Sequence, residues 1–176
     1  AGLGMEIDEV EICCEEAARR GLFLRSRGVG EWPDGTVATR YEFLHSLYHE
    51  ALYHRVTAGR RVQLHQRTGE RGERAYGERA PEIAAALAVH SERGRDLPRA
   101  IQYYQYAAAN ATRRFGYQEA IAHLTKGLAL LATQADSPAR TQQEIALQNA
   151  LGAASMAIQG YAAPAVERAY ARAHIL

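Results

Sequence analysis

The segment 41–74 constrains the fold of this chain most, because it predicts a change from strand to paired helices. A strand ending at Phe43 is followed by an amphipathic helix over Leu44–Val56, whose apolar side chains recur at helical spacing. These apolar positions are Leu44, Leu47, Tyr48, Ala51 and Leu52. A break at Ala58-Gly59 precedes a second helix that runs to about Tyr76. The segment is therefore expected to join two structurally different parts.

The residues before this segment predict a helix and a β-hairpin. A helix over Asp8–Arg20 is expected to stop at Gly21, and a strand begins at Leu22. Turn-forming residues then cluster at Gly28, Gly30, Pro33, Asp34 and Gly35. A second strand is expected over Thr36–Phe43. This order is that of the last part of a winged helix, so residues 1–57 are expected to be a truncated winged-helix remnant.

The remainder of the chain, 58–176, is expected to be a TPR-like array of antiparallel helices. After the helix that ends near Tyr76, helices are predicted over 81–93, 97–115, 117–131, 138–159 and from 164 to the end. Short loops make consecutive helices antiparallel neighbours. An alanine, large, small pattern occurs twice, as Ala100, Tyr104, Ala107 and as Ala120, Leu124, Gly127. It is typical of tetratricopeptide (TPR) second helices, but the spacing is shorter than the usual ~34-residue period, so a plain helical bundle remains an alternative.

One stretch of the joining segment resembles a known family. The pattern Phe43-x-His45-x-x-Tyr48-x-x-x-Leu52-Tyr53, followed by Arg60-Arg61-x-x-Leu64-His65, resembles the large bacterial regulators of the STAND class. These are signal-transducing ATPases with numerous domains, of the AAA or NB-ARC-like type. In them this region joins a P-loop ATPase domain to a helical repeat array. The resemblance implies a mainly α fold.

The resemblance also implies a function. The chain would be a non-catalytic segment that couples the nucleotide state of an absent ATPase domain to partner or effector binding. His45 occupies the position of a histidine that faces the nucleotide in related regulators. ATP or ADP would belong to the parent protein, with no cofactor in this chain. The expected partners are another protein or the parent's ATPase domain. Self-association is a further possibility, because such a fragment would expose surfaces that the parent protein covers.

The residues themselves argue against catalysis by this chain. Lys126 is the only lysine, and it lies between Thr125 and Gly127 inside a helical pattern. A P-loop needs Gly-Lys-Ser/Thr so that the lysine reaches the terminal phosphates. No serine stands in a Gly-x-Ser-x-Gly context. We therefore expect no enzymatic activity from this chain, whereas the parent is expected to be an ATPase or an ATPase fusion.

A metal site, a disulfide bond and a membrane-spanning segment are also not expected. His49 and His54 are five residues apart, which breaks the i, i+4 spacing of a zinc protease helix, and His45 with His49 lacks a third ligand. The adjacent Cys13 and Cys14 are poorly placed to bridge each other. A reduced, cytoplasmic setting is expected. No apolar run approaches the ~20 residues of a membrane span.

A DNA-binding winged-helix fragment is the alternative function. The arginines of the joining segment would contact phosphates, but glutamates interleave with them and the net charge is only +1. DNA is therefore not the expected partner. We instead predict a protein-binding surface that includes Tyr103, Tyr106, Arg113 and Arg114, with Tyr103 and Tyr106 exposed.

Overall fold

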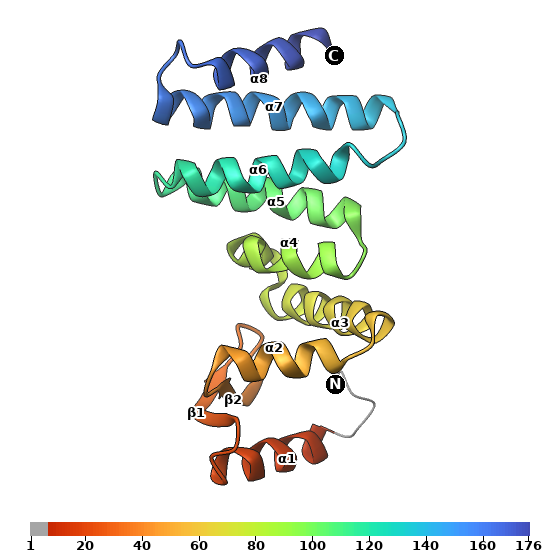
Figure 1. Cartoon of the computed structure of the whole chain (residues 1–176), viewed down its shortest axis with the longest axis vertical. Helices are drawn as coiled ribbons and strands as arrows, with labels where there is room; N and C mark the ends of the chain where they lie inside the picture. Colours follow the sequence, from red (N-terminus) through yellow and green to blue (C-terminus); the bar gives the residue numbers. More distant parts are fainter. Residues whose placement is uncertain (1–6) are drawn as a thin grey trace. The chain divides into compact units, whose positions relative to one another are not determined.

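The computed structural model describes residues 7–176, and it is mainly helical with one two-stranded antiparallel hairpin (Figure 1). This confirms the mainly α class. The elements in chain order are α1 (Ile7–Arg19), β1 (Leu24–Glu31), β2 (Val37–Phe43), α2 (Ser46–Arg55), α3 (Ala58–Tyr76), the 3-10 helix η1 (Gly77–Ile83), α4 (Ala84–Arg93), α5 (Leu97–Arg113), α6 (Tyr117–Leu131), α7 (Pro138–Gln159) and α8 (Pro164–Ile175). None of the helices in this described part is long and apolar enough to span a bilayer.

The chain packs as two compact units, the first ending at Ala80 and the second spanning Pro81–Leu176. By packing, α3 therefore belongs to the same unit as the hairpin. The predicted boundary between a winged-helix domain, 1–57, and a helical repeat domain, 58–176, stays a prediction. The helix predicted from Pro81 differs in detail, because Pro81 lies inside η1 and the α-helix begins at Ala84.

The hairpin of the first unit is longer than predicted. Leu24 pairs with Phe43 and Glu31 with Val37, so β1 continues through Gly28 and Gly30, which were expected in the turn. The register shifts between Ser26 and Val29, where Gly28 has a φ of 81°. A glycine there forms a bulge at no steric cost, so the strand continues beyond it.

The turn of the hairpin is fixed to α3 by an ion pair. Arg71 Nη1 lies 2.7 Å from Asp34 Oδ2, and its guanidinium carbon lies 4.8 Å from the centroid of the Trp32 ring. The backbone N–H of Thr36 also donates to Asp34 Oδ1 at 3.0 Å. These contacts hold the pKa of Asp34 down at about 2, mainly through the Arg71 hydrogen bond. The first unit is thus held together partly by exposed polar contacts.

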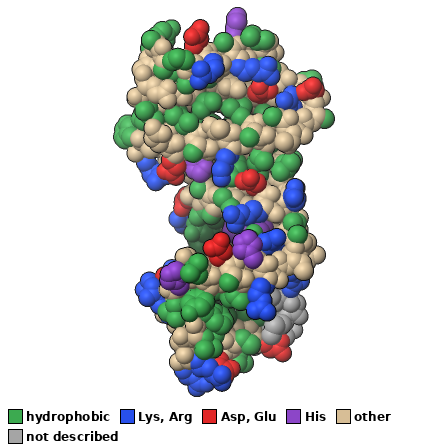
Figure 2. Space-filling model, viewed as in Figure 1, with side chains coloured by type: hydrophobic (Ala, Val, Ile, Leu, Met, Phe, Trp, Pro, Cys, Tyr) green, Lys and Arg blue, Asp and Glu red, His purple; other side chains and the backbone are tan. Residues whose placement is uncertain are grey.

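The helix predicted over Leu44–Val56 begins two residues later than expected. Leu44 donates its N–H to the Phe23 carbonyl at 2.9 Å and so extends the hairpin. His45 is the N-cap, in an extended conformation, and its Nδ1 accepts from the Leu47 N–H at 3.2 Å. None of the α2 residues is buried, and the predicted stripe is exposed at Leu44, Leu47, Tyr48, Ala51 and Leu52. Figure 2 shows hydrophobic side chains at the surface of this part of the molecule.

In the second unit α4 packs on α5, α5 on α6, α6 on α7 and α7 on α8, and these helices are stacked in order in Figure 1. The sequence placed α6 and α7 correctly, with α5 ending two residues before Phe115 and α8 ending one residue short of the C-terminus. The core is formed by Ile101, Ala108, Ala111, Ala120, Leu124, Leu131, Leu147 and Ala154.

The repeated small residues of the sequence lie at helix crossings. A Cβ built at Gly127 of α6 would lie 3.6 Å from both Leu147 and Tyr104, which is ordinary contact. Tyr104 is 1% exposed, and its hydroxyl donates to a Glu92 carboxylate oxygen. The Nζ of Lys126 lies 5.6 Å from the centroid of the Tyr104 ring. The only lysine therefore packs on this aromatic ring.

Candidate functional site

A hollow of about 590 Å³ lies on one side of the second unit. We call it the α4–α6 hollow; its lining residues are Glu82, Ile83, Ala85, Ala86, Ala107, Asn110, Arg113, Arg114 and Glu119. η1 and α4 supply Glu82, Ile83, Ala85 and Ala86, α5 supplies the floor, and Glu119 of α6 lines the other edge. The alanine side chains of the lining are small and leave the hollow unfilled. Asn110, Arg113 and Arg114 lie at the C-terminal end of α5.

Asn110 organises the polar end of this hollow. Its Nδ2 donates to the Pro81 carbonyl at 2.6 Å, which ties α5 to the segment before α4. Its Oδ1 accepts from the Arg113 guanidinium. Asn110 therefore donates to η1 and accepts from Arg113 of its own helix, α5, and the second bond orients the Arg113 side chain.

The two arginines at this end differ in their charge partners. Arg114 lies 3.2 Å from Glu119 Oε2, so its charge is compensated within the protein. Arg113 is exposed and has no ion pair among the residues that the structure describes. An uncompensated guanidinium held by an amide is suited to a carboxylate or a carbonyl of a bound segment.

The structure brings together two of the four predicted binding residues. Arg113 and Arg114 line the α4–α6 hollow, whereas neither Tyr103 nor Tyr106 does. Tyr106 is exposed as predicted, at 39%. The expectation for Tyr103 is wrong, because it is only 9% exposed. Since α5 has neighbours on both flanks, its buried arc is wider than the single stripe assumed from the sequence.

A second hollow, of about 430 Å³, lies between α6 and α8 with α7 as its floor. We call it the α6–α8 hollow; it is lined by Ile121, Thr125, Gln148, Leu151, Ser155, Gln159, Ala165, Arg168, Ala169 and Arg172. Sequence reasoning did not select any of these residues as a binding residue. The sequence does contain a pattern that could have identified the α8 residues. Ala165, Arg168, Ala169 and Arg172 recur at i, i+3, i+4 and i+7 and so share one face of the helix.

The two hollows are neighbours. In each, two walls flank an intervening helix, and α6 is a wall of both. Ala122 of α6 is exposed and lies three residues from both Glu119 in the first hollow and Thr125 in the second. Because residues of α6 line both hollows, we refer to the two hollows together as the groove.

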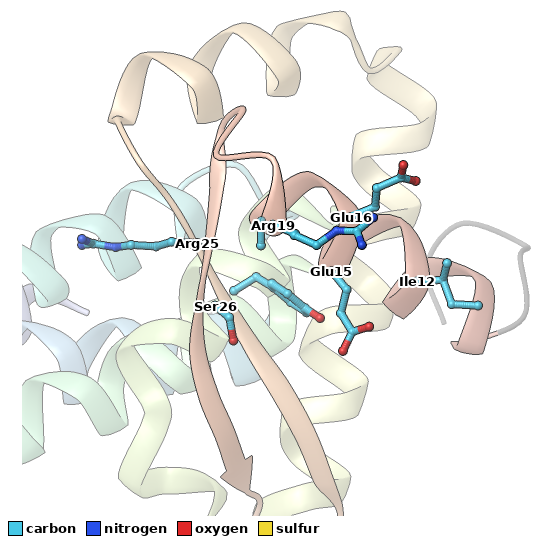
Figure 3. Close-up of a pocket in the computed structure, with 8 residues that line it drawn as sticks. Ile12, Glu15, Glu16, Arg19, Arg25 and Ser26 are labelled. Carbon is cyan, nitrogen blue, oxygen red and sulfur yellow. The ribbon is translucent and has the colours of Figure 1, made fainter.

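The first unit has a separate pocket between α1 and the hairpin, of about 720 Å³ (Figure 3). Glu15, Glu16 and Arg19 come from α1, and Arg25 and Ser26 come from β1. Tyr41 of β2 also lines the pocket, and its hydroxyl is buried without a hydrogen-bond partner in the described structure. Burial raises the pKa of Tyr41, and the charge of Glu15 adds to this. The pocket has charges of both signs, so it favours no single ligand class.

His45 is not among the lining residues of these depressions. Its side chain caps α2, and the nucleotide-facing role suggested by the resemblance stays a prediction. His49 and His54 also lie on α2. Within residues 7–176 no group of three or more His, Cys, Asp or Glu side chains is placed to hold a metal ion.

Comparison of the chain with protein-family models, with curated proteins and with solved structures finds no match.

Proposed function

We propose that this chain is a non-catalytic interaction module whose second unit binds a segment of another protein along the α4–α6 and α6–α8 hollows. The observation that carries the proposal is the pair of hollows in the second unit that are both lined by residues of α6. Their volumes, about 590 and 430 Å³, suit a few side chains of a bound segment each. TPR-like arrays present a groove of this kind to extended partners.

The chemistry of the α4–α6 hollow supports recognition by protein rather than by a small molecule. Its walls carry small apolar side chains, and its polar groups are concentrated at one end. A chain of amino acids can place apolar side chains along the walls and a polar group at Arg113.

We further propose that the chain belongs to a multidomain regulator of the STAND type, with the first unit as the winged-helix part. In this proposal the first unit relays the ATP or ADP state of an ATPase domain to the groove. The exposed apolar residues Leu44, before α2, and Leu47, Tyr48, Ala51 and Leu52 of α2 would contact that domain. The coding sequence upstream of Ala1 tests this: a Gly-Lys-Ser/Thr loop is expected, and its absence from the parent protein would rule out the class.

A pair of matched substitutions tests partner binding. Ala86 is exposed in the α4–α6 hollow, and Ala150 is exposed on α7 outside both hollows. Each variant of the full chain would be recovered from the organism that encodes it, and co-purifying chains would be counted by native mass spectrometry. Ala86→Trp should lose the bound chain and Ala150→Trp should retain it. Equal retention by both variants would contradict the proposal.

A further inference from the structure

We propose that the α6–α8 hollow is a carboxylate-binding subsite, so that the segment bound by this chain is acidic where it crosses α8. This inference depends on the proposed function and adds the chemistry of the partner. The hollow is lined by two arginines, Arg168 and Arg172, and by no aspartate or glutamate. Its other polar side chains, from Thr125, Gln148, Ser155 and Gln159, are neutral and can donate hydrogen bonds.

Arg172 is held in place by the protein itself. Its Nε lies 2.7 Å from Oε1 of Glu144, a residue of α7 that is 8% exposed. This hydrogen bond raises the pKa of Arg172, and the charge of Glu144 acts in the same direction. Arg140 Nη2 lies 3.8 Å from the other carboxylate oxygen, which has no hydrogen-bond partner in the described part of the chain. Arg172 is therefore oriented before any ligand arrives.

Arg168, one helical turn earlier, has no such partner. It is exposed and forms no hydrogen bond or ion pair with any residue from 7 to 176. The acidic residue next to it in sequence, Glu167, lines a different depression of α8 together with Tyr161 and His174. The positive charge of Arg168 is thus available to a ligand in the hollow.

The helix register places Arg168 near Ser155, a largely buried residue of α7. Tyr170 lies against Gly152, and Arg172 lies against Glu144, so α7 and α8 run antiparallel. Moving from Tyr170 back to Arg168 therefore advances along α7 from Gly152 toward Ser155. Ser155 is 2% exposed and lines the hollow. A carboxylate beside Arg168 would supply an acceptor for the Ser155 hydroxyl.

An acidic peptide fits these features better than a nucleic acid does. Binding a phosphate backbone requires a row of cations that follows the strand. Here two arginines stand over a floor and wall that include Leu151, Ala165 and Ala169. A peptide whose acidic residues are separated by small apolar residues can place its carboxylates at the arginines and its apolar side chains on this surface.

The test uses the full chain and a fluorescein-labelled peptide of alternating glutamate and alanine, followed by fluorescence anisotropy. A glutamine–alanine peptide is the neutral control, and duplex DNA is the polyanion control. Arg168→Gln removes the free charge in the hollow. Arg95→Gln is the matched variant, because Arg95 is exposed in the loop before α5 and lines neither hollow.

We expect the glutamate peptide to bind, and Arg168→Gln to weaken it by about tenfold, as for loss of a charge-assisted hydrogen bond. Arg95→Gln should change the affinity by less than about twofold, since an exposed charge outside the site acts only at long range. Equal weakening by both variants, tighter binding of DNA, or no binding of the glutamate peptide would overturn the inference. If Ala86→Trp still loses the natural partner in any of those cases, only the acidic subsite is wrong and the proposed function stands.

Discussion

The aromatic ring of Tyr170 lies directly on the backbone of Gly152, where α8 crosses α7. A Cβ built on Gly152 would come within 2.8 Å of the ring, closer than real Cβ contacts. Tyr170 itself remains 37% exposed. The glycine therefore sets how closely α8 approaches the helix that forms the floor of the α6–α8 hollow.

Two glycine substitutions should have different effects on stability. Gly127→Ala adds a methyl group at ordinary contact distance and removes a helix-interior glycine, so it should be neutral or stabilising by up to about 1 kcal/mol. Gly152→Ala should be less stable than Gly127→Ala by about 1–3 kcal/mol, because the Tyr170 ring must move away. Urea denaturation of the full chain measures both. The difference should largely vanish when Tyr170 is also alanine; a difference that persists would show that the ring is not its cause.

The hydrogen bond from Tyr104 to Glu92 predicts a loss of stability at alkaline pH. Burial raises the pKa of Tyr104 well above its usual value, and the hydrogen bond to Glu92 adds to this. The folded state therefore keeps this proton while the unfolded state loses it above about pH 10, so the free energy of unfolding falls there. Tyr104→Phe should lower stability by about 1–2 kcal/mol at neutral pH and should remove this part of the decline.

Denaturation of both proteins at about pH 8 and about pH 11 isolates the contribution of Tyr104, because the other tyrosines titrate in both. The stability gap between the two proteins should narrow at the higher pH. A constant gap would contradict the assigned role of the hydroxyl.

The ion pair between Asp34 and Arg71 predicts an unusually acidic carboxyl group in the hairpin turn. The hydrogen bond from Arg71 lowers the pKa of Asp34 to about 2, and the Thr36 N–H assists. Carbon-detected NMR titration of the Asp34 carboxyl should show a midpoint in that region. In Arg71→Gln the midpoint should move up toward the usual aspartate value. An unchanged midpoint would mean that Arg71 does not hold the turn in solution.

The position of His45 separates a capping role from a nucleotide-sensing role. Asparagine can cap a helix as the imidazole does, so His45→Asn should leave stability nearly unchanged, whereas His45→Ala should cost about 0.5–2 kcal/mol. If the imidazole also faces a nucleotide in the parent regulator, His45→Asn should reduce ADP retention there. If the His45→Asn variant retains ADP fully, His45 acts only as the N-cap of α2 and not as a nucleotide sensor.

The sequence predicted helices well where the stop signals were local. Pro138 and Gly160 bound α7, and Gly116 precedes α6, because proline and glycine act through the backbone of their own position. The start of α2 was misplaced because Leu44 is held by Phe23, a contact between residues distant in sequence. The hairpin turn was misplaced for a similar reason, since Gly28 forms a bulge inside a paired strand.

The binding site was only partly predictable. Arg113 and Arg114 were found because adjacent arginines at a helix end are visible in the sequence. Tyr103 was wrongly expected on the surface because its burial depends on helices on both flanks of α5. Arg168 and Ser155 were missed because they are brought together only by the antiparallel register of α7 and α8.

Site-specific photocrosslinking tests the central claim most directly, because it reports contact with the groove itself. Ala122 is exposed on α6, three residues from a lining residue of each hollow, and a photoreactive benzophenone side chain there should give a discrete crosslinked product in the organism that encodes the chain. The same group at Ala150, outside both hollows, should give none. Products of equal yield at the two positions, or no product at Ala122, would contradict the proposal that this side of the helical unit binds a protein segment.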